Sequence, residues 1–339
     1  MELEPQYLAL LAREGLQDLL AAPDPAAVRA YVEGLSEQER EYIGEDVIGP
    51  IRDAGYVVAP ENPFESVDAT IRKVLAASGA AVPGGTYVGE FPHRSFNAQA
   101  LPVPGGTLIL LNTGLRSLLD RVATTLVASQ LFFRRGERDA IEYETPTLDQ
   151  ERRRAEADTA LAEAVVAYVS QSRTDPAAAP RLGLNPDGAF SFFIARSAEQ
   201  FAIGHEYGHL LAGHLHSPPD GTEERRRHEY EADELAAMLI LRGIDDSGEM
   251  LWRLLAVAGP FLFLAVDHLV TRVRNAVYEI PDGLLTPTHP PSDERAAVLR
   301  GIFTRLGERH LLQFADAWVS SLEQREPTIV ELARTALTA

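Results

Sequence analysis

Two histidines and a glutamate form the part of the sequence with the clearest chemical meaning. His205, Glu206 and His209 stand in the order His-Glu-x-x-His, on a helix that a capping box at Ser197 and Gln200 predicts to begin near Ser197. Histidines four residues apart lie on one helix face, where both rings can bind one metal ion. Glu206 lies about 100° further round the helix, which suits a general base acting on a metal-bound water.

A third metal ligand is expected on a second helix, which the sequence predicts to start near Thr222. A catalytic zinc ion takes three protein ligands and keeps its fourth position open. Twenty residues after His209, Glu229 shares a helical stripe with Ala232 and Ala236, and these small side chains would let the two helices pack closely. We therefore expect Glu229 to be the third ligand, with a solvent-facing carboxylate in an arginine-rich helix as the alternative.

Three neighbours of Glu229 could also act at the site. Asp233, one helical turn further on, is expected to accept a hydrogen bond from a ligand histidine and so to fix its tautomer. His228 and Glu231 are rival ligands, which should point elsewhere if the alanines form the packed face.

The composition restricts the chemistry of any such site. The chain of 339 residues has no cysteine, which excludes disulfides, thiolate zinc sites, iron–sulfur clusters and a cysteine nucleophile. Any metal must therefore be held by His, Asp or Glu. The formal net charge of −19, from 31 basic and 50 acidic residues, disfavours nucleic acid and anionic lipid as partners.

The sequence predicts a cytoplasmic protein without stable membrane insertion. Its acidic beginning does not resemble a secretory signal. The longest apolar run, Leu254–Val266, would reach roughly 20 Å as a helix, against roughly 30 Å for the hydrocarbon core of a bilayer. We expect this run to form a buried helix kinked at Pro260.

The remaining pattern predicts a mostly helical α+β fold with a small sheet. Apolar runs next to Pro-Gly-Gly turns indicate strands at 86–91 and 107–111. Helical patterns and breakers indicate short helices over 1–58, helices over 65–77, 114–133, 159–169 and from 197 onward, a solvated connection or helix face over 134–158, and a loop over 174–188. We divide the chain into an N-terminal helical region, 1–80, and a domain, 81–339, with an insertion around 120–195.

Four motifs along the chain follow the order found in one family of metallopeptidases. They are Asn97-Ala-Gln-Ala with Pro104-Gly-Gly and Thr113-Gly-Leu115, the His-Glu-x-x-His helix with His214 five residues on, Glu229-x-x-Ala-Asp233, and His289-Pro290-Pro291 followed by Arg295. Together they resemble the gluzincins, and more narrowly the M48 family of CAAX prenyl protease type 1 and HtpX-like peptidases. The resemblance covers roughly 86–116 and 197–300, and about ninety residues separate Leu115 from His205, more than in most relatives.

The resemblance implies a zincin-like domain and a zinc metalloendopeptidase with one Zn²⁺ per chain, held by His205, His209 and Glu229. A zinc ion lowers the pKa of its bound water towards neutrality. Glu206 would take that proton as the water attacks a peptide carbonyl, and would hand it to the leaving amine.

The resemblance also brings the segment around His289 to the active site. His289 would then stabilise the oxyanion of the tetrahedral intermediate beside zinc, although an ordinary loop histidine before two prolines is an equally open interpretation. Arg295 would order this segment or pair with a carboxylate.

A peptide or protein substrate is expected to bind as an added strand. The strand Thr107–Asn112 could present an edge to an extended peptide, while a core strand is the alternative for its apolar run. The residues expected to contact substrate are Asn97, Ala98, Thr107, Leu108 and Ile109.

The other histidines are expected to have structural roles. His214 and His216 would end the zinc helix, because cations suit a helix C-terminus, and His268 would be a satisfied core residue. The alternative to a peptidase is a regulatory or partner-binding protein on a metallopeptidase scaffold, with gated or vestigial activity. The sequence does not separate peptide maturation, defence and quality control as biological roles.

Overall fold

A computed structural model gives the fold of most of the chain. It describes residues 3–16, 33–34, 64–82, 84–130, 133–135, 141–143, 148–171, 186–217, 219–244, 250–280 and 289–338. Most of the short helices expected over 1–58, and the part of the expected loop before residue 186, lie outside these residues.

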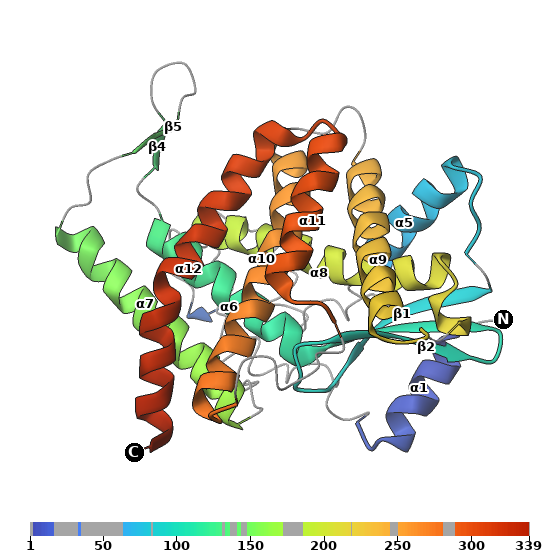
Figure 1. The fold of residues 1–339 in the computed structure, drawn as a ribbon, viewed down its shortest axis with the longest axis horizontal. Coiled ribbons are helices and arrows are strands. Elements are labelled where there is room, and N and C mark those ends of the chain that lie inside the picture. The colour runs from blue at the N-terminus through green and yellow to red at the C-terminus, as the bar shows by residue number, and fades with distance from the viewer. Residues whose placement is uncertain are drawn as a thin grey trace.

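A three-stranded mixed sheet lies at one side of the molecule (Figure 1). The strand order is β1 (Gly85–Phe91), β3 (Gly106–Asn112), β2 (Ala98–Val103), with β1 parallel and β2 antiparallel to β3. Leu108–Leu111 are fully buried because β3 is covered on both faces. Both predicted strands are confirmed, and the unbroken apolar run of β3 is what a doubly covered strand requires.

Two helices from the predicted N-terminal region pack on the body of the domain. α1 (Glu4–Arg13) covers the outer face of the sheet, where its Tyr7 hydroxyl donates to the Glu90 carbonyl at 2.5 Å. α5 (Glu65–Ala77) contacts α9 and β1, and its bounds are those that the sequence predicts. The boundary at residue 80 remains a prediction.

Helices form the rest of the fold. In chain order they are α6 (Thr113–Gln130), α7 (Leu148–Gln171), α8 (Pro186–Leu211), α9 (Thr222–Gly243), α10 (Met250–Val277), α11 (Ser292–Arg305) and α12 (Arg309–Thr338), with a 3₁₀ turn at His214–His216 and a two-stranded hairpin of β4 (Phe133–Arg135) and β5 (Ile141–Tyr143). The hairpin projects from the body in Figure 1. The predicted class, a mostly helical α+β fold with a small sheet, is confirmed.

The predicted start of the histidine helix is wrong. α8 begins at Pro186, so the last residues of the expected loop are helical and Ser197 lies in the helix interior. Proline suits the first turn of a helix, where its missing N–H leaves no hydrogen bond unmade. The Ser197 hydroxyl donates instead to the Leu255 carbonyl of α10 at 2.5 Å, which joins the two central helices.

The apolar run Leu254–Val266 lies within a longer helix than expected. Trp252–Val277 is long and apolar enough to cross a membrane, and 67% of its most hydropathic window is buried inside the protein. α10 packs mainly against α8 and α12, as a core helix does. His268 of α10 is not a core residue, because its side chain is 39% exposed and its Nε2 lies 3.5 Å from Glu326 of α12.

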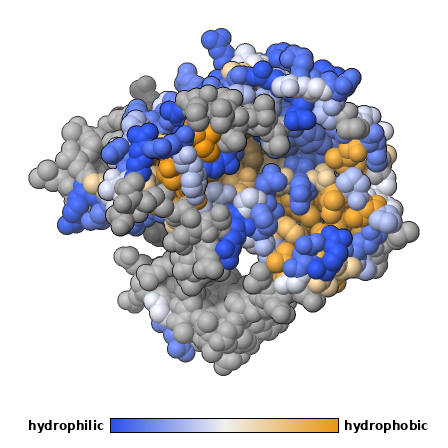
Figure 2. All heavy atoms as spheres, turned by 60° about the horizontal axis from the view of Figure 1, so that its bottom comes forward, coloured by the Kyte–Doolittle hydropathy of each residue, from blue (hydrophilic) through white to orange (hydrophobic). Residues whose placement is uncertain are grey.

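Hydrophilic side chains dominate much of the described surface on the face in Figure 2, with a group of hydrophobic side chains at one side. Among the described residues, the large hydrophobic side chains that are exposed are Leu8, Phe192, Met250, Trp252, Tyr278, Leu306 and Leu332.

Candidate active site

Close packing of α8 on α9 brings the predicted metal ligands together. A Cβ at Gly208 would lie 2.7 Å from the Ala232 carbonyl oxygen, and one at Gly204 would lie 3.3 Å from Ala236. The alanine stripe of α9 is therefore the packed face, as predicted, and Gly208 is required because any side chain would push the helices apart. This contact places Glu229 opposite the two histidines of α8.

The side chains of His205, His209 and Glu229 converge on one point. Their ligand atoms all lie within 4.8 Å of one another. The two Nε2 atoms are 3.0 Å apart, and they lie 3.3 Å and 3.5 Å from the Glu229 carboxylate oxygens. Tetrahedral ligands at zinc bonding distances are about 3.4 Å apart.

Glu229 gives an independent sign that this group suits a cation. It is 6% exposed, and no described residue makes a hydrogen bond of good geometry to its Oε2, although His205 Nε2 and His289 Nε2 lie 3.3 Å and 3.4 Å away. A buried carboxylate oxygen without a partner is costly, and a bound cation would remove that cost. The three residues therefore fit a metal ion by donor type, spacing and burial.

His205 is oriented through two buried charged residues. Its Nδ1 lies 2.9 Å from Asp233 Oδ1, and Arg295 of α11 donates to both Asp233 oxygens, at 2.9 Å from Nε and 2.6 Å from Nη2. Asp233 is fully buried and Arg295 is 3% exposed. The predicted contact of Asp233 with a ligand histidine is present, and of the two expectations for Arg295 the geometry shows pairing with a carboxylate.

Burial and charge shift the pKa values of the converging residues in different directions. Burial lowers the pKa of His205, but its contacts with the carboxylates of Asp233 and Glu229 outweigh burial and raise that pKa to about 9. Burial, assisted by the charge of His205, lowers the pKa of His209 to about 3. Burial also opposes ionisation of Glu229, yet contact with His205 holds its pKa at about 2. The metal-free His205 is thus protonated at neutral pH beside an ionised Glu229, and a metal ion bound by His205 would displace that proton.

Glu206 lies beside the converging group without belonging to it. Its side chain is 8% exposed, and burial raises its pKa, although the backbone N–H of Ala100 in β2 donates to the carboxylate and opposes this. The predicted base therefore lies against the sheet edge formed by β2.

His289 is brought to the same place by the chain before α11. Its Nε2 lies 3.4 Å from Glu229 Oε2, and its side chain is 40% exposed. It lines a hollow of about 40 Å³ together with Asn97, Ala98 and Glu206. The structure thus brings together all the residues predicted for catalysis, metal binding and orientation of the ligands.

The residues predicted to bind substrate lie at two different places in the sheet, the central strand and an edge strand. β3 is the central strand, hydrogen-bonded on both sides, so Thr107, Leu108 and Ile109 cannot offer an edge to a peptide. That expectation is wrong. β2 is the edge strand on this side of the sheet, and it contains Ala98, with Asn97 directly before it.

The rival ligands of α9 contact another histidine instead of the metal group. The rings of His214 and His228 stack with centroids 3.8 Å apart, and His214 Nε2 lies 3.4 Å from Glu231 Oε2. His214 Nδ1 lies 3.0 Å from His209 Nδ1. His214 therefore contacts a predicted ligand directly, which the prediction of a helix-ending role missed; Gly213 directly before it, a residue type that often ends a helix by reversing the chain, was the available signal.

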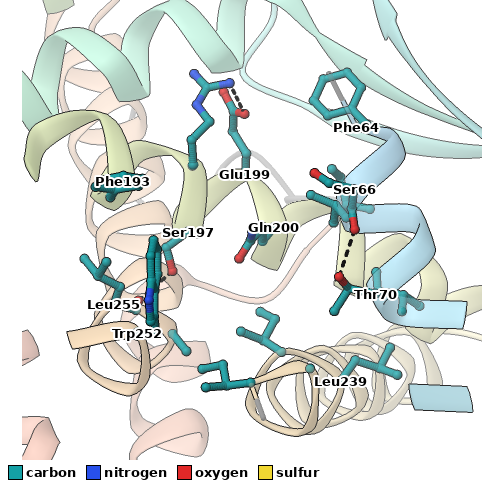
Figure 3. Close-up of a pocket in the computed structure, with 18 of the residues that line it drawn as sticks. Phe64, Ser66, Thr70, Phe193, Ser197, Glu199, Gln200, Leu239, Trp252 and Leu255 are labelled. Carbon is teal, nitrogen blue, oxygen red and sulfur yellow. Dashed lines mark hydrogen bonds and ion pairs between the residues drawn. The ribbon is translucent and has the colours of Figure 1, made fainter. Parts of the chain in front are cut away.

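A larger cavity, of about 690 Å³, lies between α5, α8, α9 and α10. Figure 3 shows Gln200, Leu239 and Trp252 around it, with Glu199 at one end. Glu199 forms an ion pair with Arg196, which also lines the cavity. The cavity shares α8 with the hollow at Glu206 but none of its lining residues. Cavity size alone would point here, whereas the titratable and metal-binding groups converge elsewhere.

Comparisons with known proteins agree with a peptidase. The family model for peptidase U49 matches residues 125–315, a stretch that includes the metal group, Glu206, Asp233, His289 and Arg295. No curated protein and no solved structure gave a significant match. Because the matched stretch is more than half of the chain, this chain belongs to the peptidase U49 family, which implies a peptide or protein substrate.

Proposed function

We propose that this protein is a zinc-dependent endopeptidase with a mechanism like that of the M48 peptidases. The observation that carries the proposal is the convergence of His205, His209 and Glu229, with a buried carboxylate oxygen to which no described residue makes a hydrogen bond of good geometry. These residues would hold the metal. When bound, zinc supplies Lewis acidity, which lowers the pKa of a water molecule and polarises a carbonyl oxygen.

Glu206 is the proton carrier in this proposal. It takes a proton from the attacking water and gives it to the nitrogen of the leaving amine as the peptide bond breaks. Burial raises its pKa, which brings its proton affinity closer to that of a useful general base and acid at neutral pH. His289, whose side chain is 40% exposed, donates to the carbonyl oxygen of the substrate as that oxygen becomes negative.

One edge of β2 pairs with no strand among the described residues, and this edge is the proposed site for an extended substrate. The Asn112 N–H donates to the Asn97 carbonyl at 3.1 Å. In an antiparallel pair, the backbone N–H and C=O groups of alternate residues point to the same side. Those of residues 97, 99, 101 and 103 therefore point to β3, and those of residues 98, 100 and 102 point to the opposite edge. The N–H of Ala100 is taken by Glu206. The carbonyl groups of Ala98 and Ala100 and the N–H of Ala98 are thus suited to pair with a peptide beside the catalytic carboxylate.

The test is the Glu206→Gln variant, with metal content and cleavage of a proteome-derived peptide mixture as the two measurements. We expect it to bind one zinc ion per chain as the wild type does and to lose about 10²- to 10⁴-fold in activity. Glu223→Gln, which changes an exposed carboxylate at the start of α9, is the matched control and should stay active. Unchanged cleavage by Glu206→Gln would refute the mechanism.

The small hollow favours a second candidate, a peptidase scaffold whose chemistry is gated or lost. A volume of about 40 Å³ admits a few water molecules and no side chain of a substrate. A wild-type protein that binds no zinc on titration would favour this alternative. Zinc binding with cleavage would exclude it.

A further inference from the structure

We propose that His214 is a positioning residue for the metal centre, which fixes the tautomer of His209 as Asp233 fixes that of His205. This inference rests on the proposed zinc-binding function. It concerns what we call the histidine link: His209, His214 and Glu231, joined in that order by the two contacts of the His214 ring.

The contacts of the histidine link leave His214 outside the metal group. Its Nδ1 lies 3.0 Å from His209 Nδ1, and its Nε2 lies 3.4 Å from Glu231 Oε2. The converging group contains His205, His209 and Glu229 but not His214. Both ring nitrogens of His214 are thus engaged by protein atoms, so the residue acts on the metal only through His209.

The direction in which His209 faces the other ligands assigns the ring protons of His209 and His214. His209 faces the other ligands through Nε2, so this nitrogen must carry the lone pair for a metal and Nδ1 must carry the proton. Two nitrogens 3.0 Å apart need one donor and one acceptor. His214 Nδ1 is therefore the acceptor, and the His214 proton sits on Nε2, from which it donates to Glu231.

Local structure fixes the His214 ring in this position. α8 ends at Leu211, and Gly213 has a φ of 76°, a left-handed conformation that reverses the chain under the last turn of the helix. The His214 ring then stacks on His228, with an angle of 9° between the planes. The His228 side chain is 9% exposed and that of His214 is 8% exposed, so neither ring turns freely.

The two ends of the link differ in strength. The contact of His209 with His214 is between shielded groups, whereas the Glu231 side chain is 47% exposed. Water competes for an exposed carboxylate and weakens its hydrogen bonds. The acceptor nitrogen of His214 therefore contributes most of the effect, and Glu231 contributes little.

Two substitutions of His214 separate positioning from packing. Asparagine can place an amide oxygen where Nδ1 lies and so keeps the acceptor while losing the ring. Phenylalanine keeps the ring that stacks on His228 and loses the acceptor. We would measure the zinc dissociation constant of each metal-free variant by competition with a chelator, and its thermal unfolding without zinc.

Positioning predicts a zinc dissociation constant about 10- to 100-fold higher for His214→Phe, and values within about threefold of wild type for His214→Asn and Glu231→Gln. If His214→Phe binds zinc as wild type does, or if both His214 variants weaken binding equally, the proposal is overturned. ¹⁵N shifts of the histidine rings in the zinc-bound wild type give a test that needs no variant: a protonated Nδ1 on His214 would also overturn it. A wild type that binds no zinc refutes the proposed function itself.

Discussion

Replacing Arg295 by methionine tests whether the buried pair with Asp233 supports the site. Methionine keeps most of the volume of the side chain but removes the donors at 2.9 Å and 2.6 Å from the Asp233 oxygens. Asp233 is fully buried, so no water can replace those donors. The variant leaves a buried carboxylate whose remaining partner is the Nδ1 of His205.

The expected loss of stability follows from this burial. Removing one partner of a buried ion pair costs about 3–5 kcal/mol. The contact with His205 persists, so we expect the lower end, about 3 kcal/mol, or roughly 4 °C in Tm for a chain of this length. Burial raises the pKa of Asp233, but Arg295 outweighs burial and holds it below the ordinary value. Its stabilising contribution is therefore complete at pH 7 and falls only below about pH 4.

The same two helices offer a matched control. Arg305 of α11 pairs with Glu234 of α9 at 2.9 Å, with side chains 63% and 46% exposed. Arg305→Gln should cost less than about 1 kcal/mol, because exposed pairs are screened by water. The assay is thermal and urea unfolding of metal-free protein at pH 7. If Arg295→Met matches Arg305→Gln, the buried pair does not stabilise the site and the reasoning fails.

Three further predictions concern the ring proton of His205, the pH dependence of stability and the edge of β2. Because the metal-free His205 has a pKa of about 9, zinc binding at pH 7 should release about one proton. Calorimetry in buffers of different ionisation enthalpy measures this release. If no proton is released, the metal-free His205 is not protonated at pH 7. The same raised pKa stabilises the metal-free fold below about pH 6.5, and this contribution should be lost as the pH rises through about 9. Ala98→Pro removes an N–H that faces the free edge of β2 and should raise KM with little loss of stability. Gln99→Pro, whose N–H faces β3, should unfold the protein more readily; an unchanged KM for Ala98→Pro would argue against substrate binding at this edge.

The convergence of the candidate metal group was predictable because much of the information is local. A spacing of four residues fixes the relative directions of His205 and His209 on any helix. The prediction of Glu229 as third ligand depended on a contact between two helices. Ala232 and Ala236 indicate this contact in the sequence, because small residues at helical spacing permit close helix packing. The same reasoning gave the contact of Asp233 with a ligand histidine.

The sheet edge was not predictable from the strand sequences alone. Strand order depends on which segments pair, and the pairing of β3 with both neighbours is a property of the whole fold. One signal was available: the run Leu108–Leu111 does not alternate with polar residues, which is typical of a strand buried on both faces. This pattern favoured the core strand over the substrate-binding edge.

The start of α8 shows how a local motif can mislead. Ser197 and Gln200 have the spacing of a capping box, but the apolar residues continue towards the N-terminus as far as Phe190, and Asn185-Pro186 is itself a helix-start pattern. A serine inside a helix can use its hydroxyl on a neighbouring element, as Ser197 does with Leu255. Where two start signals compete, the one that includes the whole apolar stretch is the better guide.

The contacts of His214 depend on where α8 ends, so they too could not be predicted from residue spacing alone. If α8 continued past Leu211, His214 would lie five residues from His209 and about 140° away around the helix, with no contact between the rings. The end of the helix and the positive φ of Gly213 turn this separation into a contact of 3.0 Å. The preference for cations at helix C-termini accounts for a histidine at position 214 but not for its contact with His209. The two histidines of the candidate metal group are therefore held differently: His205 contacts Asp233 on another helix, and His209 contacts His214 in the turn that follows its own helix.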